Sequence, residues 1–320
     1  MKICVSSPYP LTEMRGNTVT ALRVAGLLCE LGHEARASHG YDGEFADACI
    51  VLHAVKGAQA VFDFKKAHPK GRVVVLMTGT DLYEFLPRGS EEGMAALREA
   101  DAIVVMIEQA VESLPEEFRE KAVVIRTSLE EMGNRVKAPR TENEGKFVIS
   151  VIGHLRPVKR PFLVVETVAR YPEWEDVEVW QVGSALDEES RATVEEWERK
   201  EPRYRWWGGV SPERAHELCA LSSLTVNSSI SEGGSNAVLE AMAMGVPVLA
   251  SEIEGNIGIL GENYAGYFQK GKLDQKLLRL FNNPAMLGEW KEMAKRRLPL
   301  FSRESELASW SELLRRLPNF

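Results

Sequence analysis

Short apolar runs alternate along the chain with longer stretches in which apolar residues recur every three or four positions. The short runs are typical of strands buried on both faces, and the longer stretches are typical of amphipathic helices. The pattern predicts strands at residues 2–5, 34–38, 48–52, 72–77, 102–106, 122–125, 147–152, 177–182, 204–207, 224–226, 246–250 and 264–268. It predicts helices at residues 18–31, 58–67, 91–100, 109–114, 162–170, 188–200, 212–221, 236–244, 273–281, 285–297 and 303–317. This alternation predicts an α/β fold with parallel, doubly wound sheets.

A change of composition at residues 138–146, APRTENEGK, divides this series in two. The segment is polar and charged, so we interpret it as an interdomain linker, with a surface loop inside one domain as the alternative. The sequence therefore predicts two Rossmann-like domains, 1–143 and 144–302, whose parallel sheets face a cleft between them. The closing amphipathic helix, at 303–320, is predicted to pack back on the first domain.

The length, composition and net charge of the chain agree with two domains and exclude several classes of protein. A chain of 320 residues accommodates two domains of about 150 residues each. Its composition, 44% hydrophobic and 27% charged, is typical of globular proteins, and the net charge of −8 disfavours nucleic acid as a partner. No apolar run reaches the roughly 18 residues of a membrane span, and the apolar run at residues 1–5 is too short for a signal peptide. The expected location is the cytoplasm.

The cysteines, Cys4, Cys29, Cys49 and Cys219, are scattered, and each lies in an apolar run. This distribution predicts reduced core residues in a cytoplasmic protein. No Asp-x-Asp pair or His cluster has the spacing of metal ligands, so we expect no metal cofactor.

The most informative stretch is 224–256, which reads as strand, polar loop, helix and strand. In such a βαβ unit, the loop lies beyond the carboxyl end of a strand and against a helix N-terminus, where open α/β sheets bind ligands. Glu232 in the loop and Glu240 in the helix can reach one ligand from adjacent levels. Between them stand residues suited to close approach of a phosphate, Gly233, Gly234, Ser235 and Asn236. The alternative is a pair of solvated surface glutamates.

A basic segment, GHLRPVKRP, follows the first strand of the second domain. Its cationic side chains are His154, Arg156, Lys159 and Arg160. Such groups stabilise the negative charge of a diphosphate leaving group without a metal, whereas the alternative is a solvated basic turn. Gly153 and Gly208, which follow strands of the same domain, are further candidates for donor binding.

In the first domain, polar residues follow several predicted strands. They are Gly16 and Asn17, His53 and Lys56, and Thr78, Thr80 and Asp81. The first loop lacks a G-x-G-x-x-G, so dinucleotide binding is weakly supported. We interpret these residues as candidates for acceptor binding, with a structural His53 and a helix-capping Asp81 as the alternatives.

The segments SEGGSNAVLEAMAMGVPVLAS and GHLRPVKRP resemble the GT-B glycosyltransferases of the retaining family 4 type. The resemblance implies that Glu232 lies by the donor sugar, that Glu240 binds the nucleotide ribose and that Lys159 binds the donor diphosphate.

The chain departs from this family pattern at two positions. His154 stands where the family usually has Arg, and Arg156 is the candidate to compensate. In EGNIG, Gly258 stands where the family usually has Glu.

Further segments look like those of the selenosugar synthases of selenoneine biosynthesis: GNTVTALR, VLHA, TGTDLY, GHLRPVKRP, PRYRWWG, SEGGSNAV and EGNIGILG. The resemblance implies transfer of a sugar from UDP-N-acetylglucosamine or UDP-glucose to selenophosphate, giving a 1-selenosugar, UDP and phosphate. It also implies the selenoneine synthase and the selenophosphate synthetase of the same pathway as partners. The implied catalytic residues are Glu232, Lys159, Arg156 and His53.

A small anionic acceptor fits the polar and cationic contacts that Asn17, His53, Lys56, Thr78 and Thr80 offer. Selenium is a strong nucleophile and needs a general base less than an alcohol does. The main alternative is a family 4-type enzyme with an alcohol, sugar or lipid acceptor. A sugar-nucleotide binding protein without transfer activity and a GT-B epimerase are the others.

Overall fold

The computed structural model describes residues 1–13, 16–129 and 145–317. The chain divides into two compact units: unit 1 comprises Met1–Ser128 and Leu300–Phe320, and unit 2 comprises Leu129–Pro299. The predicted linker at 138–146, with its boundary between residues 143 and 144, falls almost wholly on 130–144, outside the described residues.

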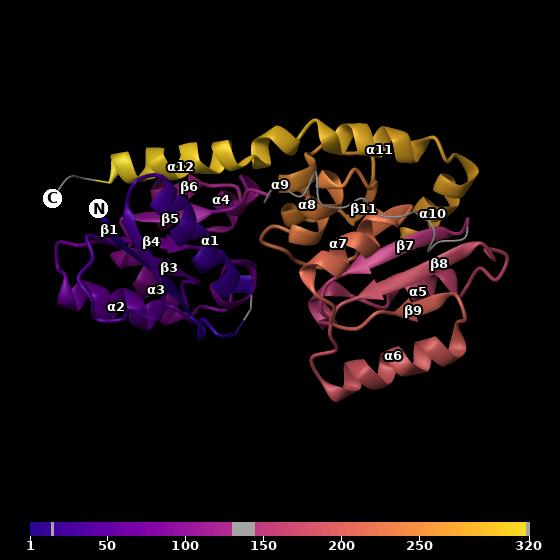
Figure 1. The fold of residues 1–320 in the computed structure, drawn as a ribbon, viewed down its shortest axis with the longest axis horizontal. Helices are drawn as coiled ribbons and strands as arrows, with labels where there is room; N and C mark the ends of the chain where they lie inside the picture. The colour runs from indigo at the N-terminus through magenta and orange to yellow at the C-terminus, as the bar shows by residue number, and fades with distance from the viewer. Residues whose placement is uncertain (14–15, 130–144, 318–320) are drawn as a thin grey trace. The chain divides into compact units, whose positions relative to one another are not determined.

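Unit 1 contains a six-stranded parallel sheet in the order β2-β1-β3-β4-β5-β6. Figure 1 labels β1, β3, β4, β5 and β6 of this sheet. Its strands are β1 (Lys2–Ser7), β2 (Glu34–His39), β3 (Ala48–Leu52), β4 (Arg72–Leu76), β5 (Ala102–Val105) and β6 (Ala122–Val124). Its helices are α1 (Gly16–Glu30), α2 (Ala58–Ala67), the π-helix η1 (Asp81–Phe85), α3 (Glu91–Glu99), α4 (Gln109–Ser113), the 3-10 helix η2 (Glu116–Lys121) and α12 (Arg303–Arg316).

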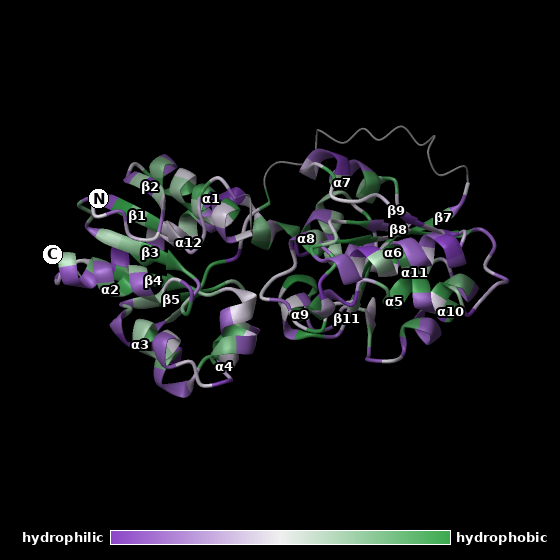
Figure 2. Cartoon of the chain, turned by 90° about the horizontal axis from the view of Figure 1, so that it is seen from below, coloured by the Kyte–Doolittle hydropathy of each residue, from purple (hydrophilic) through white to green (hydrophobic). Residues whose placement is uncertain are grey.

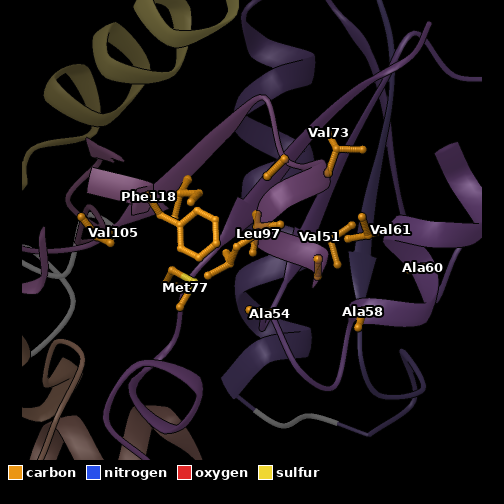
Figure 3. Close-up of a cluster of buried hydrophobic side chains, with 14 of the residues drawn as sticks. Val51, Ala54, Ala58, Ala60, Val61, Val73, Met77, Leu97, Val105 and Phe118 are labelled. Carbon is orange, nitrogen blue, oxygen red and sulfur yellow. The ribbon is translucent and has the colours of Figure 1, made fainter. Parts of the chain in front are cut away.

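Alternate side chains of these strands pack on opposite faces of the unit 1 sheet, because successive residues of a strand point in opposite directions. Val51 and Val73 join the cluster under α2 and α3, whereas Ile50 and Val74 join the cluster under α1 and α12. Figure 3 shows the first cluster, which Phe118 of η2 also enters. Burial on both faces explains why these strands read as continuous apolar runs.

Unit 2 contains a second six-stranded parallel sheet, in the order β12-β11-β10-β7-β8-β9. Its strands are β7 (Phe147–Ile152), β8 (Val177–Val182), β9 (Tyr204–Trp206), β10 (Leu224–Asn227), β11 (Val248–Ser251) and β12 (Tyr267–Phe268). Its helices are α5 (Leu163–Val168), α6 (Glu188–Lys200), α7 (Pro212–Ala220), α8 (Asn236–Ala243), α9 (Glu254–Leu260), α10 (Leu273–Asn282) and α11 (Met286–Lys295). Figure 2 shows hydrophilic and hydrophobic residues alternating along helices such as α3 and α10, as expected of helices with one buried face.

The order of each sheet reverses at one point, which is where open α/β sheets leave room for a ligand. In unit 1, the reversal lies between β1 and β3, and in unit 2 it lies between β7 and β10. The loops that follow these strands therefore separate at the carboxyl edge of each sheet.

The predicted α/β class with two parallel sheets is confirmed, and most predicted strands and helices agree closely with the observed ones. The strand predicted at 264–268 is wrong in length, since only Tyr267–Phe268 pairs with β11. Helix α9 was not predicted, because its sequence EGNIGIL contains two glycines and its N-cap position, Ile253, provides no side-chain cap.

Three cysteines, Cys4, Cys49 and Cys219, are buried free thiols as predicted, but Cys29 is exposed near the end of α1. The prediction for Cys29 is wrong because its position on the helix turns it away from the sheet. Within the described ranges, every helix is too short or too polar to cross a bilayer. In the same ranges, no three His, Cys, Asp or Glu side chains come together as metal ligands do.

The carboxylate of Glu306, 3% exposed, is the main polar anchor of α12. It accepts hydrogen bonds from the backbone N–H of Ser128 at 2.6 Å and from Nε1 of Trp310 at 3.3 Å. It also forms an ion pair with Arg23 of α1. One carboxylate thus joins α12 to α1 and to the residue at which the chain leaves unit 1.

We predict that Glu306→Ala lowers the free energy of unfolding by about 3–5 kcal/mol, because it leaves the partly buried Arg23 guanidinium and the Ser128 N–H without their acceptor. Glu312→Ala is the matched control on the same helix, because the Glu312 side chain is 43% exposed and, among the described residues, pairs only with the exposed Arg315 and Arg316. We expect it to change stability far less, because ion pairs in contact with solvent contribute little. Urea unfolding measures both, and equal losses would contradict the anchoring role of Glu306.

Candidate functional site

An ion pair lies at the reversal point of the unit 2 sheet. Nζ of Lys159, in the loop after β7, donates to Oε1 of Glu232, in the loop after β10, at 2.9 Å. Because β7 and β10 are neighbours, their loops leave the same edge of the sheet side by side. The structure therefore brings together two of the residues that the sequence singled out.

Backbone contacts hold these two loops against each other. The hydroxyl of Ser228 donates to the carbonyl oxygens of Lys159 at 2.8 Å and Arg160 at 3.0 Å. The N–H of Ile230 donates to the carbonyl oxygen of Val158 at 2.8 Å. Lys159 ends a short 3-10 turn, Pro157–Lys159, and Arg160 follows with a φ of 45°, which turns the chain into α5. The turn fixes the direction from which Lys159 reaches the carboxylate.

Residues 228–235 form the Glu232 loop. A hydrogen bond inside this loop also orients the glutamate. The hydroxyl of Ser229 donates to Oε1 of Glu232 at 2.7 Å. The same oxygen therefore receives both Ser229 and Lys159, while Oε2 has no hydrogen-bond partner among the described residues. One oxygen of the carboxylate is fixed by the protein and the other is available to a ligand.

The N-terminus of α8 follows this loop. Ser235 occupies its N-cap position, yet its side chain makes no capping hydrogen bond, because its hydroxyl accepts from Nδ2 of Asn227 at 2.9 Å. Gly233 is buried, Gly234 has a φ of 159°, and Asn236 is exposed. The first N–H groups of α8 are therefore left uncapped by Ser235, which favours an anion at this end of the helix.

Glu240, one turn into α8, faces α7. Its Oε2 lies 3.5 Å from Nε2 of His216. The hydrogen bond with Glu240 raises the pKa of His216 above its usual value. Sequence reasoning missed His216, since nothing in its spacing distinguishes it from a surface residue of α7.

Two glycines permit close approach of the ends of β7 and β8. Gly153 and Gly183 have φ angles of 145° and 143°, and a Cβ on Gly183 would lie 2.1 Å from the carbonyl oxygen of Gly153. Gly208 has a φ of 71°, in the left-handed region that favours glycine. The backbone therefore requires glycine at position 183, which the sequence analysis did not predict.

The remaining cations of the basic segment do not join the ion pair. His154 is exposed, and its Nδ1 accepts the N–H of Ser184 at 3.2 Å. Arg156 is exposed, and its side chain forms no ion pair or hydrogen bond within the described residues. Of the segment's side chains, Lys159 alone contacts Glu232 among the residues that the structure describes.

In unit 1, the buried carboxylate of Asp81 organises the strand ends. It accepts the N–H groups of Ala54 at 2.8 Å, Thr78 at 2.7 Å and Leu82 at 3.2 Å, and the hydroxyl of Thr78 at 2.8 Å. Burial raises the pKa of Asp81 to about 6, although these hydrogen bonds lower it. Asp81 is not a helix cap, because Thr80 occupies the N-cap position of η1. It ties the loop after β3 to the loop after β4.

His53 is also buried, and its φ of 72° is unusual for a residue with a side chain. Its Nδ1 accepts the N–H groups of Val55 at 3.3 Å and Lys56 at 3.2 Å, so the proton of the neutral ring resides on Nε2 and faces Oγ1 of Thr80 at 3.1 Å. Burial, followed by the charge of Lys56, lowers the pKa of His53 to about 4. The ring is therefore neutral near pH 7.

The other acceptor candidates lie around these residues. Nζ of the exposed Lys56 donates to the hydroxyl of Tyr9 at 2.7 Å. Gly16 and Asn17 begin α1. The hydroxyls of Ser7 and Thr18, both buried, lie 3.4 Å apart. Sequence reasoning missed these contacts: it placed Ser7 and Tyr9 in the loop after the strand predicted at 2–5, and Thr18 at the start of the helix predicted at 18–31.

Comparison with known families identifies one match. A family model for the glycosyl transferases of group 1 matches residues 134–297, just over half of the chain. Over 88 residues, the chain is 34% identical to the alpha-galactosylglucosyldiacylglycerol synthase of Streptococcus pneumoniae. That match covers 28% of this chain and 24% of the relative, so it spans only about a quarter of the relative's length.

Solved structures resemble the whole chain at low sequence identity. Sucrose-phosphate synthase from Thermosynechococcus elongatus superimposes with a TM-score of 0.79 at 14% identity, over 99% of each chain. HepE from Anabaena, solved in complex with UDP and glucose, superimposes with a TM-score of 0.76 at 16% identity, over 99% of this chain and 100% of HepE. At these identities, the likeness shows a common fold.

Asp81 and His53 have opposite pKa shifts, which we expect to cancel in the pH dependence of stability. The raised pKa of Asp81 means that the folded state holds this proton more tightly than the unfolded chain, so its contribution to stability falls as pH rises from about 4 to about 6. The lowered pKa of His53 means that the unfolded chain holds that proton more tightly, so its contribution rises over the same range.

Single variants should separate the two contributions. As pH rises from 4 to 6, we expect the free energy of unfolding of His53→Gln to fall by about 3 kcal/mol relative to the wild type, because only the Asp81 contribution remains. We expect that of Asp81→Asn to rise by about as much, because only the His53 contribution remains. Urea unfolding at a series of pH values measures these differences. Parallel curves for the wild type and both variants would contradict the titration of this pair.

Proposed function

Because this chain belongs to the glycosyl transferases of group 1, we propose that it transfers the sugar of a UDP-sugar, UDP-N-acetylglucosamine or UDP-glucose, to selenophosphate. Its fold is GT-B, two parallel six-stranded sheets with helices, as in the solved neighbours. In the proposed reaction, selenium forms a bond to the anomeric carbon as UDP leaves. Water then cleaves the selenium–phosphorus bond, which releases phosphate and a 1-selenosugar for selenoneine biosynthesis.

The observation that carries the proposal is the ion pair between Lys159 and Glu232 beside the N-terminus of α8. A diphosphate leaving group gains negative charge as the bond to the sugar breaks. Lys159 and the N–H groups of α8 can stabilise this charge without a metal. HepE, of the same fold, was solved with UDP and glucose, which supports a UDP-sugar as the donor.

We assign the donor to unit 2 in three parts. The unpaired Oε2 of Glu232 accepts a hydroxyl of the donor sugar, and Glu240 accepts the ribose hydroxyls. The diphosphate binds at Lys159 and at the turn that leads into α8. Arg156, whose side chain has no partner among the described residues, is the candidate to join the diphosphate. His154, Gly153, Gly208, Gly233, Gly234, Ser235 and Asn236 complete the proposed donor contacts.

We assign the acceptor to the strand ends of unit 1. Selenophosphate is a small anion, and the exposed ammonium of Lys56 offers it a positive charge. Neutral His53 keeps a donating N–H toward Thr80, so this pair is suited to donate hydrogen bonds to an anion rather than to remove a proton. Selenium needs little help from a base, which is consistent with that role. Gly16, Asn17, Thr78 and Asp81 complete the proposed acceptor side.

One observation supports a second candidate, a lipid or other alcohol acceptor. The curated relative is by name a synthase of a glycosylated diacylglycerol, although the match covers about a quarter of it. A cytoplasmic location, metal-independent transfer, and a selenophosphate synthetase and selenoneine synthase as pathway partners belong to the first proposal. The acceptor therefore decides between the two.

We predict that the purified protein releases UDP from UDP-N-acetylglucosamine or UDP-glucose when selenophosphate is supplied, in the presence of a chelator. Mass spectrometry should detect the 1-selenosugar. Each UDP-sugar without an acceptor is the control, and it should release little UDP. Turnover with diacylglycerol, glycolipid or simple sugar acceptors, and none with selenophosphate, would overturn the selenophosphate proposal in favour of the second candidate.

We also predict that the two glutamates have separable effects. Glu240→Ala should weaken UDP binding by roughly 10-fold or more, because a hydrogen bond to a charged group contributes about 1.5–3 kcal/mol. Glu232→Ala should mainly lower kcat. Calorimetry and initial rates measure the two effects, and Glu292→Ala, on the exposed side of α11, is the control. Unchanged binding and kcat in both variants would remove the assignment.

A further inference from the structure

The side chain of Asn256, in the first turn of α9, is completely buried in unit 2. Its Nδ2 donates to the carbonyl oxygen of Ser251 at 2.9 Å and to Oδ1 of Asn227 at 3.1 Å, and it lies 3.2 Å from the Ser251 hydroxyl. Because the Ser251 carbonyl can only accept, the amide nitrogen must point this way. Oδ1 of Asn256 is left without a hydrogen-bond partner among the described residues.

Asn227, the last residue of β10, also makes hydrogen bonds to the Glu232 loop. Its Oδ1 also accepts the N–H of Ser229 at 3.2 Å, and its Nδ2 donates to the hydroxyl of Ser235 at 2.9 Å. Ser229 lies near the start of the loop, and Ser235 is the N-cap position of α8. One amide therefore spans the loop that presents Glu232.

Ser229 is the link between this amide and the carboxylate. Its N–H is held by Asn227, its carbonyl oxygen accepts the Ser251 hydroxyl at 2.6 Å, and its own hydroxyl donates to Glu232 at 2.7 Å. With its backbone held on both sides, Ser229 can direct its hydroxyl at one oxygen of Glu232. A continuous series of hydrogen bonds thus runs from Asn256 to Glu232, although the two side chains make no hydrogen bond with each other.

The unpartnered Oδ1 of Asn256 costs stability and offsets part of what the hydrogen bonds of its Nδ2 contribute. A buried amide oxygen without a partner loses its hydration and gains nothing in return, whereas a leucine of similar size has no polar atom to desolvate. Packing therefore does not account for an asparagine at this position. The orientation of the Glu232 loop does account for it.

We propose that Asn256 is a positioning residue for sugar transfer: through Asn227 and Ser229, it holds the carboxylate of Glu232 in the orientation that the reacting sugar requires. This inference rests on the proposed role of Glu232 in transfer. The effect falls mainly on kcat, because Lys159 and Glu240, two of the proposed contacts of the UDP part, make no hydrogen bond to Asn256 or Asn227. Ser235, at the turn into α8, is held by Nδ2 of Asn227, whereas Asn256 contacts Oδ1 of Asn227.

The test is Asn256→Leu, assayed in the full chain with the acceptor that supports UDP release. Loss of orientation at the reacting carbon should lower kcat roughly 10- to 100-fold. The KM for the UDP-sugar should stay within about threefold, and a cooperative thermal unfolding transition should show that the variant folds. Ser229→Ala, a smaller change at the last link, should lower kcat in the same way, and the double variant should be no slower than the slower single variant.

Gln181→Leu is the matched control. Gln181 is also a completely buried amide of unit 2. Among the residues that the structure describes, its oxygen also has no partner, and its Nε2 donates only to the carbonyl oxygen of Val151, at 3.3 Å. It has no link to Glu232, so its kcat should be unchanged.

An unchanged kcat in Asn256→Leu, or an equal loss in Gln181→Leu, overturns the positioning role. If Asn256→Leu does not fold, an unchanged kcat in Ser229→Ala overturns it. A wild-type protein that releases no UDP from any UDP-sugar, with any acceptor, instead overturns the proposed function and this inference with it.

Discussion

The ion pair between Lys159 and Glu232, 2.9 Å long, is the interaction on which the arrangement of the candidate site in unit 2 depends. It joins the loops after β7 and β10, which are neighbouring parallel strands and end at the same edge of the sheet. The polar contacts of Ser228, Ser229 and Asn227 all serve to hold one partner of this pair or its loop. The ammonium and the carboxylate are thereby oriented before any ligand is present, so binding does not have to order them.

In unit 1, a single buried carboxylate holds the loops at the strand ends together. Asp81 accepts hydrogen bonds from the N–H of Ala54, just after β3, and from the N–H of Leu82 in η1. His53 has a left-handed backbone conformation, and its ring contacts Thr80. Burial shifts both pKa values toward the neutral forms, to about 6 for Asp81 and about 4 for His53. Near pH 7 the His53 ring is therefore neutral, whereas the Asp81 carboxylate is mostly ionised and its charge is held by the N–H groups that it accepts.

Sequence patterns predicted the sheets well because their strands are buried on both faces and read as apolar runs, whereas the glycine-containing α9 shows no such run. They also identified Glu232 and Lys159, because each lies in a recognisable sequence motif. They did not identify Asn256, Asn227 or His216, because each acts through a contact far away in the sequence. A single asparagine in a turn of helix looks like a surface residue until its neighbours in space are known.

Unit 1 takes its residues from two distant parts of the chain, Met1–Ser128 and Leu300–Phe320. During synthesis, all of unit 2 is therefore translated before Trp310 and Leu313 can cover their face of the first sheet. At ordinary rates of translation, this interval lasts roughly 10–30 seconds. Throughout it, the first unit has an open apolar face to which chaperones have access, and the unit that comes second along the chain is the first that can finish folding.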